Sequence, residues 1–137
     1  MRVATREDIA GMHRVRLAVR ENRLVSRVIT EADYVAAIEL PGRGWVVESN
    51  GEIVAFAVGN SETGNIWALF VDPEYEGRGH GRRLLDATVQ WLWEQGVALL
   101  WLTTSPGTRA EHFYDAAGWR QAGITDSGEV RFELTRS

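Results

Sequence analysis

The middle of the sequence constrains the possible folds more than any other part. It starts with a nearly all-apolar run, Asn65–Val71, which is typical of a strand covered on both faces. A glycine-rich turn at Gly77–Gly81 and an amphipathic stretch to Gln95 follow, and Ala98–Thr103 is a second apolar run. This order predicts two parallel strands joined through a helix by a right-handed crossover, which is an α/β arrangement.

Local signals on both sides of this unit predict a mixed fold. Thr5 and Thr30 have the sequence context of helix N-caps, and they predict helices to about Asn22 and Leu40. Asn50-Gly51 is a hairpin turn signal. The other predicted elements are strands at Met1–Ala4, Gly44–Ser49, Glu52–Gly59, Trp119–Ile124 and Val130–Leu134, and a short helix at Thr108–Ala117. Together they predict one domain over residues 1–137, an α/β fold in the order β-α-α-β-β-β-α-β-α-β-β, with a mixed central sheet of about seven strands and about four helices.

The composition excludes several kinds of chemistry. The chain of 137 residues has no cysteine, and all 15 of its basic residues are arginine, against 19 acidic residues. It therefore has no disulfide, thiolate metal site, cysteine nucleophile or Walker-type lysine. The net charge of −4 is unlike that of a protein that binds nucleic acid through bulk charge. Because it has no apolar run of about 18 residues and no signal-peptide core, we expect a cytoplasmic chain without a membrane partner, and no metal.

The glycine-rich turn is the part of the sequence that points to a ligand. Helix N-termini carry unpaired N–H groups and a partial positive charge, so they attract anions. The three glycines of Gly77–Gly81 let the backbone wrap closely around a phosphate, and Arg78, Arg82 and Arg83 add guanidinium donors. The spacing differs from the dinucleotide-binding G-x-G-x-x-G, and a flexible capped turn without a ligand is the alternative.

The same turn resembles motif A of the GCN5-related N-acetyltransferase (GNAT) superfamily, R/Q-x-x-G-x-G/A. It reads Glu76-Gly77-Arg78-Gly79-His80-Gly81 and follows a Leu-Phe-Val-Asp-Pro run at Leu69–Pro73. A second segment, Arg109-Ala-Glu-His-Phe-Tyr-Asp-Ala-Ala-Gly-Trp119, is similar to motif B, A-x-x-x-Y-x-x-x-G-F/W. The order of predicted elements matches as well, so the resemblance covers essentially the whole chain. It implies a GNAT fold, acetyl-CoA as the acetyl donor and a primary amine as the acceptor.

The resemblance also implies roles for individual residues. The backbone of Phe70 and Val71 would pair with the pantetheine arm like an added strand, in a cleft beside Ala98–Thr103. A main-chain N–H near Val71 would polarise the thioester carbonyl. Tyr114 matches the motif B tyrosine, which protonates the departing CoA thiolate; simple packing on its helix face is the alternative. The backbone N–H groups that would hold the pyrophosphate belong to Arg78, Gly79, His80, Gly81 and Arg82.

Two positions depart from the family pattern. Glu76 stands where motif A usually has Gln or Arg, and a carboxylate near a pyrophosphate needs a partner, for which Arg78 is a candidate. The strand Ile66–Phe70 lacks the glutamate that often serves as general base. The sequence offers three other candidates for the general base without ranking them: Glu48, Glu62 and His112. With no cysteine to form an acyl-enzyme, we expect direct transfer in a ternary complex.

The acceptor side is the least defined part of the expected site. A basic arc of roughly 80° on the first predicted helix contains His13, Arg16, Arg20, Arg23 and Arg27. We expect Arg16 and Arg20 to guide an acceptor with a carboxylate or phosphate; a solvated basic face is the alternative. A small-molecule amine is the favoured acceptor. The alternatives are a peptide or protein amine and a non-catalytic acyl-CoA-binding regulatory module. Trp93 lies opposite the apolar face of its helix, which indicates an exposed position or a contact in a homodimer.

Overall fold

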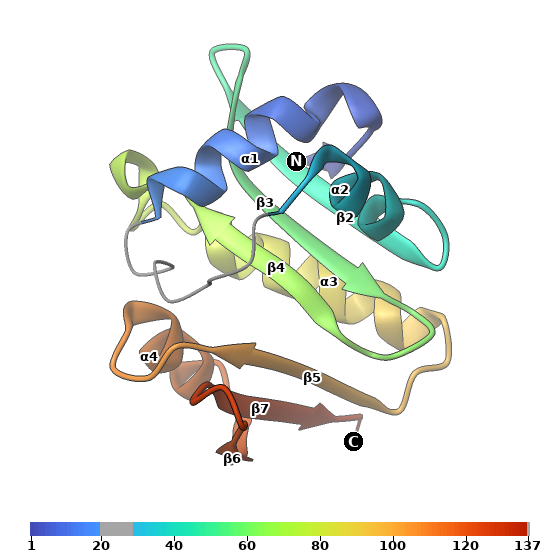
Figure 1. Ribbon diagram of the computed structural model, residues 1–137, viewed down its shortest axis with the longest axis vertical. Helices are drawn as coiled ribbons and strands as arrows, with labels where there is room; N and C mark the ends of the chain where they lie inside the picture. Colours follow the sequence, from blue (N-terminus) through green and yellow to red (C-terminus); the bar gives the residue numbers. More distant parts are fainter. Residues whose placement is uncertain (20–28, 137) are drawn as a thin grey trace.

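The computed structural model describes residues 1–19 and 29–136, which form seven strands in two sheets (Figure 1). The first sheet has the order β1-β2-β3-β4, with β1 at Arg2–Val3, β2 at Gly42–Ser49, β3 at Glu52–Asn60 and β4 at Ile66–Val71. The second has the order β5-β7-β6, with β5 at Leu99–Thr104, β6 at Arg120–Ile124 and β7 at Val130–Thr135. Neighbouring strands within each sheet are antiparallel.

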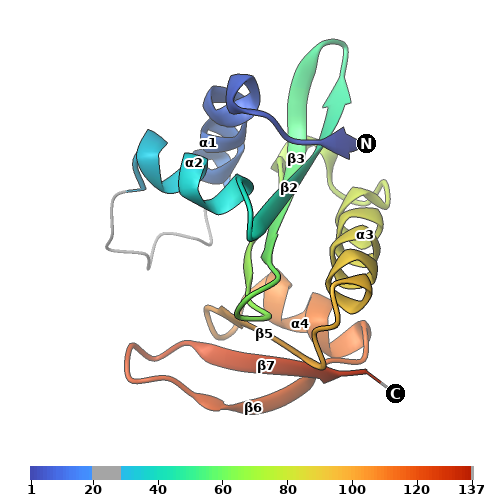
Figure 2. The ribbon, with the colours of Figure 1, turned by 90° about the vertical axis from the view of Figure 1, so that its right-hand side faces the viewer.

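Helices cover both faces of the first sheet. One face carries α1 (Ile9–Ala18), which follows the 3-10 turn η1 (Arg6–Asp8), and α2 (Glu31–Ile38). The opposite face carries α3 (His80–Glu94), as Figure 2 shows. A second 3-10 turn, η3 (Pro73–Tyr75), lies between β4 and α3, and α4 (Arg109–Ala116) packs on the second sheet. This order of helices and strands confirms the predicted α/β fold.

The predicted central sheet of about seven strands is divided into two sheets, and the division lies where the family resemblance implies a cleft beside Ala98–Thr103. In the described part of the chain, β4 and β5 are joined by one parallel bridge, between Asn65 and Trp101. Trp101 is fixed there by its Nε1, which donates to the Thr63 carbonyl (3.1 Å), and by its backbone N–H, which donates to the Gly64 carbonyl (3.0 Å). Beyond this bridge the two strands diverge (Figure 1), and a cleft lies between them.

Two hydrophobic cores lie on the two faces of the first sheet. The core under α1 and α2 contains Met12, Tyr34 and Phe56, which are at most 1% exposed. The core under α3 continues into the second sheet and contains Trp91, as its helical spacing predicts. Trp93 is partly buried and packs against this second core, so its ring is not fully exposed.

The first helix is shorter than the sequence indicates. Val19 leaves the helical conformation (φ −81°, ψ 100°), so α1 ends at Ala18. Arg16 is therefore in the last turn of the helix. Three arginines of the predicted basic arc lie outside the described residues: Arg20, Arg23 and Arg27. Among the helices that the structure describes, none is long and apolar enough to cross a membrane.

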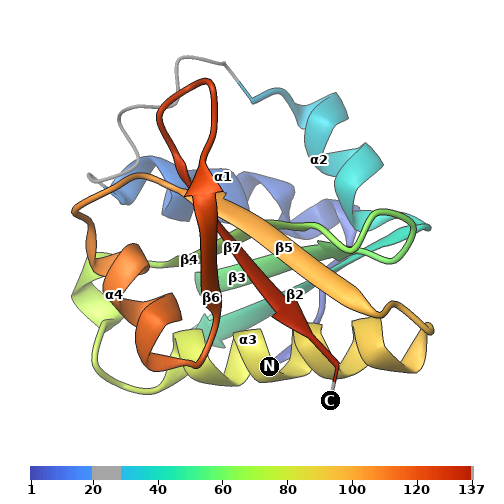
Figure 3. The same ribbon diagram turned by 90° about the horizontal axis from the view of Figure 1, so that it is seen from below.

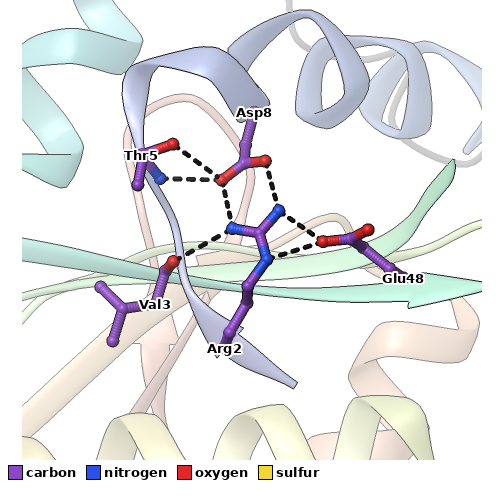
Figure 4. Close-up of polar contacts among 5 residues, drawn as sticks. All are labelled: Arg2, Val3, Thr5, Asp8 and Glu48. Atoms are coloured by element: carbon purple, nitrogen blue, oxygen red, sulfur yellow. Dashed lines mark hydrogen bonds and ion pairs between the residues drawn. The ribbon is translucent and has the colours of Figure 1, made fainter. Parts of the chain in front are cut away.

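A charged network holds the start of the chain against the first sheet (Figure 4). The Arg2 guanidinium donates to both carboxylate oxygens of Asp8, at 2.8 Å each, and to Oε1 of Glu48 on β2 at 2.6 Å. The backbone N–H of Thr5 donates to Asp8 at 2.8 Å. The hydrogen bond from Arg2 is the main cause that holds the pKa of Asp8 below its ordinary value, although burial acts against it. Glu48, a candidate base in the sequence, is thus part of a structural ion pair.

Candidate active site

The cleft between the two sheets has a volume of about 420 Å³. Its walls are β4 and β5, which Figure 3 shows from below, and one end is formed by the glycine-rich turn and the start of α4. The end of α1 contributes Val19, and the turn between β6 and β7 contributes Glu129. The cleft therefore collects residues from segments that are far apart in the sequence.

The wall formed by β4 presents an edge of backbone to the cleft. β4 is the last strand of its sheet and pairs with β3 on one side only, so the groups on its other side are available to a ligand. Val58 is opposite Ala68 and Gly59 is opposite Ile66, which makes Trp67 the extra residue of a β-bulge. The bulge turns Trp67 toward the core under α1 and α2, on the same side as Ala68.

The glycine-rich turn has the conformation that its glycines permit. Gly77 and Gly79 have φ angles of 76° and 84°, in the left-handed region that favours glycine, and Gly79 is the residue before α3. The bond from the Arg83 N–H to the Gly79 carbonyl (3.1 Å) closes the first turn of α3. The amides before Arg83 therefore have no acceptor within the helix, and they form the anion-attracting N-terminus that the sequence predicts.

Most of the predicted cofactor-binding residues meet in the cleft. Those that line it are Phe70, Val71, Gly79, His80, Gly81 and Arg82. Arg78 is not part of the lining, and its guanidinium lies over the Tyr75 ring, 5.0 Å from the centroid. Arg83 donates to Nδ1 of His80 at 2.6 Å. Burial, followed by the charge of Arg83, lowers the pKa of His80 and favours the neutral ring.

Glu76 does not pair with Arg78, the partner that the sequence suggests. Its carboxylate forms an ion pair with Arg109, the first residue of α4, and both residues line the cleft. Arg78 is held by Tyr75, so the suggested pair of Glu76 with Arg78 is wrong. Glu76 and Arg109 lie far apart in the sequence, so no local pattern indicates their contact.

Tyr114 lies at the border between the cleft and the core. It lines the cleft, yet it is only 5% exposed, and its ring contacts Phe113, Trp119 and Phe132. Burial raises the pKa of the phenol well above its ordinary value. The hydroxyl therefore keeps its proton throughout the physiological pH range.

None of the three candidate bases lines the cleft, and the structure offers another carboxylate there. Glu62 and His112 are exposed, and Glu48 is paired with Arg2. Among the described residues, the carboxylates in the lining are those of Glu76 and Glu129. Glu129 is half-buried and accepts a long hydrogen bond from the Ser127 hydroxyl (3.4 Å). Its sequence context, a turn with Gly128, looks like an ordinary solvated hairpin, so no local signal identifies it.

Arg16 lies behind the wall of the cleft. Its guanidinium carbon is 5.1 Å from the Trp67 ring centroid and 5.0 Å from that of Phe70, and both rings line the cleft. Tyr34, whose hydroxyl is 2.9 Å from Nδ1 of His13, is packed edge-on against Trp67. In the described part of the chain no three His, Asp or Glu side chains gather in a way that would hold a metal ion.

Comparisons with known proteins agree with this geometry. The sequence pattern of the Acetyltransferase (GNAT) family matches residues 7–119. The ribosomal protein bS18-alanine N-acetyltransferase of Escherichia coli is 33% identical over 78 residues, which are 55% of this chain and 53% of that protein. The chain thus spans about half the length of the bS18-modifying relatives it matches. The amino-acid acetyltransferase of Pseudomonas putida is 30% identical over 141 residues, 100% of this chain and 30% of that protein.

Solved structures share the fold. The PaiA N-acetyltransferase of Thermoplasma acidophilum, in complex with coenzyme A, has a TM-score of 0.82 at 14% identity, and the match covers 99% of this chain and 100% of that one. The ribosomal-protein-S18-alanine N-acetyltransferase of Escherichia coli has a TM-score of 0.76 at 20% identity, with 97% and 92% covered. These likenesses confirm the expected fold.

Proposed function

Because the chain belongs to the Acetyltransferase (GNAT) family, we propose that it is an N-acetyltransferase that moves the acetyl group of acetyl-CoA to a primary amine. The observation that carries the proposal is the cleft itself. It joins the open edge of β4, a helix N-terminus with a glycine-rich turn, and a buried tyrosine. These are the features that a long ligand with amides, a diphosphate and a thioester requires.

Each part of acetyl-CoA has a complementary wall in the cleft. The backbone groups of the Phe70–Val71 segment that face away from β3 would pair with the amides of the pantetheine arm in the manner of a β-strand. The amides of the turn, from Arg78 to Arg82, would hold the pyrophosphate at the start of α3, where the helix dipole favours negative charge. In our proposal Arg78 contributes its backbone only, since its side chain is stacked on Tyr75.

The chemistry follows from the groups at the thioester. A neutral amine attacks the thioester carbon, the C–N bond forms, and the negative charge that develops on the oxygen is stabilised by a main-chain N–H near Val71. The C–S bond then breaks, Tyr114 gives its proton to the departing thiolate, and the proton released by the attacking nitrogen restores the phenol. Because the chain has no cysteine, the acetyl group passes directly from CoA to the amine.

A small acceptor with an acidic group is the substrate class we favour. The similarity to the amino-acid acetyltransferase covers 100% of this chain, whereas the similarity to the bS18-modifying enzyme covers 55% of it. The role toward an acceptor carboxylate that the sequence suggests for Arg16 and Arg20 stays a proposal, because Arg16 lies behind Trp67 and Phe70 and Arg20 lies outside the described residues. Glu129 is suited to receive the ammonium group of the acceptor and to take its proton. A peptide or protein amine is the second candidate, because relatives of this chain are named as enzymes that acetylate an alanine of ribosomal protein bS18.

A thiol-release assay tests the proposal directly. The chain is incubated with acetyl-CoA and a panel of amines with and without a carboxylate, including free amino acids and a short peptide with an N-terminal alanine. We expect CoA release with the free amino acids, and a higher kcat/KM than for the matching amines that lack the carboxylate. Equal kcat/KM values would contradict the acidic acceptor. Binding of acetyl-CoA in a thermal-shift experiment without any release would support a non-catalytic acyl-CoA-binding module.

A further inference from the structure

We propose that Arg109 is a positioning residue of the cofactor site, which neutralises the Glu76 carboxylate and so allows an acidic residue at the start of the phosphate-binding turn. The inference rests on the proposed function, since it concerns the binding of CoA. It goes further because it gives a residue outside the turn, Arg109, an effect on the affinity for the cofactor's phosphates. The pair joins the segment before α3 to the first residue of α4.

The position of Glu76 makes its charge relevant to the ligand. It lies directly before Gly77, lines the cleft, and has 31% of its side chain exposed. Arg109 lies on the other wall and has 72% of its side chain exposed. Figure 3 shows the start of α4 beside the turn that leads into α3. The ion pair thus bridges the end of the cleft where the phosphates would bind.

The arginines next to Glu76 in the sequence already have other contacts. Arg78 lies over Tyr75, Arg82 donates to Asp86 at 3.1 Å, and Arg83 donates to His80 at 2.6 Å. Arg109 is therefore the residue that balances Glu76 in the described structure. If the guanidinium were removed, the uncompensated carboxylate would repel the phosphates of CoA.

A double-mutant cycle measures the coupling between Glu76 and Arg109, and the proposal predicts the direction in which CoA affinity changes in each variant. The dissociation constants of CoA and of pantetheine, which has no phosphate, are determined by calorimetric titration at low salt. We expect Arg109→Met to weaken CoA binding about three- to tenfold and Glu76→Gln to strengthen it about two- to fivefold. The double variant should return to within about twofold of the unaltered chain, because both charges are gone.

Pantetheine and salt separate this role from a structural one. Pantetheine affinity should stay the same in all variants, and the differences for CoA should disappear at about 1 M salt, where charges are screened. The matched control is Arg6→Met, which removes an arginine from an exposed pair with Glu39 away from the cleft and should leave CoA binding unchanged.

Two results would overturn the inference. One is a double variant that binds CoA as weakly as Arg109→Met, and the other is an equal loss of pantetheine affinity. An unaltered chain that binds neither CoA nor pantetheine would instead overturn the proposed function, so the two failures are distinguishable.

Discussion

The ring of Tyr114 is tilted against the ring of Phe132 at a centroid distance of 5.7 Å, so the residue proposed to protonate CoA is also part of the hydrophobic core. The phenyl part of the side chain packs between α4 and the second sheet, and the residue also lines the cleft. The two roles belong to different atoms of one side chain, and a substitution that removes the hydroxyl alone can separate them.

Replacing Tyr114 with phenylalanine should therefore reduce activity more than stability. We expect kcat to fall at least about tenfold, because general acid catalysis is lost. The free energy of unfolding should change by less than about 1 kcal/mol, since the ring contacts remain. Steady-state kinetics and urea unfolding measure the two effects. A variant with unchanged kcat on a true substrate would leave Tyr114 with a packing role only.

The network around Asp8 should make stability depend on acidic pH. The guanidinium of Arg2 lowers the pKa of Asp8 in the folded chain, so the ionised form is the stabilising one. Its contribution is fully present above the unfolded pKa of about 3.9 and is lost as the pH falls through the lower folded pKa. Asp8→Ala should lower the free energy of unfolding by about 1–3 kcal/mol at pH 7, and by progressively less as the pH falls below 4.

Urea unfolding at pH 7 and at pH 3 tests this dependence. The control is Asp86→Ala, which removes a carboxylate with 63% of its side chain exposed. Exposed ion pairs contribute little to stability, and we expect the free energy of unfolding to change by less than about 1 kcal/mol. If Asp8→Ala lost the same stability at both pH values, the ionised form of Asp8 would have no special role.

Glu129 should affect the amine and not the cofactor. We expect Glu129→Gln to raise the KM for the amine about three- to thirtyfold, because a charged hydrogen bond to the ammonium is lost, and to lower kcat, because the group that takes the proton is lost. CoA affinity should stay within about twofold. Glu62→Gln is the matched control, since Glu62 is an exposed turn glutamate outside the cleft lining. An unchanged KM in Glu129→Gln, measured over an amine titration, would argue against an acceptor on this side.

The two glycines at the start of α3 should respond differently to alanine. Gly79 has a φ of 84°, and an alanine there should cost about 1–2 kcal/mol and weaken CoA binding by displacing the turn. At Gly81 a Cβ would lie 3.5 Å from Val71 and 3.7 Å from Phe113, which is ordinary contact. Gly81→Ala should therefore leave CoA affinity within about threefold and keep or raise stability by about 0.5–1 kcal/mol. Thermal unfolding and calorimetric titration compare the variants, and equal effects would contradict the proposed role of the turn geometry.

The features that follow from local sequence were predicted, and those that depend on distant contacts were not. The capping pair of Thr30 and Asp33, the Asn50-Gly51 hairpin and the helix after Gly79 are set by neighbouring residues, and the structure has all three. The split of the sheet at Trp101 depends on how the two strands twist and pack after folding. No periodicity in the sequence encodes that, and the cleft is implied only by the family resemblance.

The same distinction applies to the candidate site. The glycine-rich turn and Tyr114 belong to compact motifs and were identified from them, and the structure brings both to one cleft. The partner of Glu76 and the presence of Glu129 in the lining depend on contacts between segments that only the fold brings together. The helical pattern also overestimated the length of α1, since the change of conformation at Val19 has no local breaker such as glycine or proline.

The bridge between Asn65 and Trp101 joins the two sheets at one side of the cleft, so it would act as a hinge between them. Three hydrogen bonds and the stacked guanidinium of Arg131 hold Trp101, the third residue of β5, beside the start of β4. From this bridge β4 extends about 20 Å to Val71, so a rotation of about 5° at the bridge would move that end of β4 by about 2 Å. A small angular change at Trp101 would therefore change the width of the cleft by about an atomic radius near Val71, where the thioester would lie.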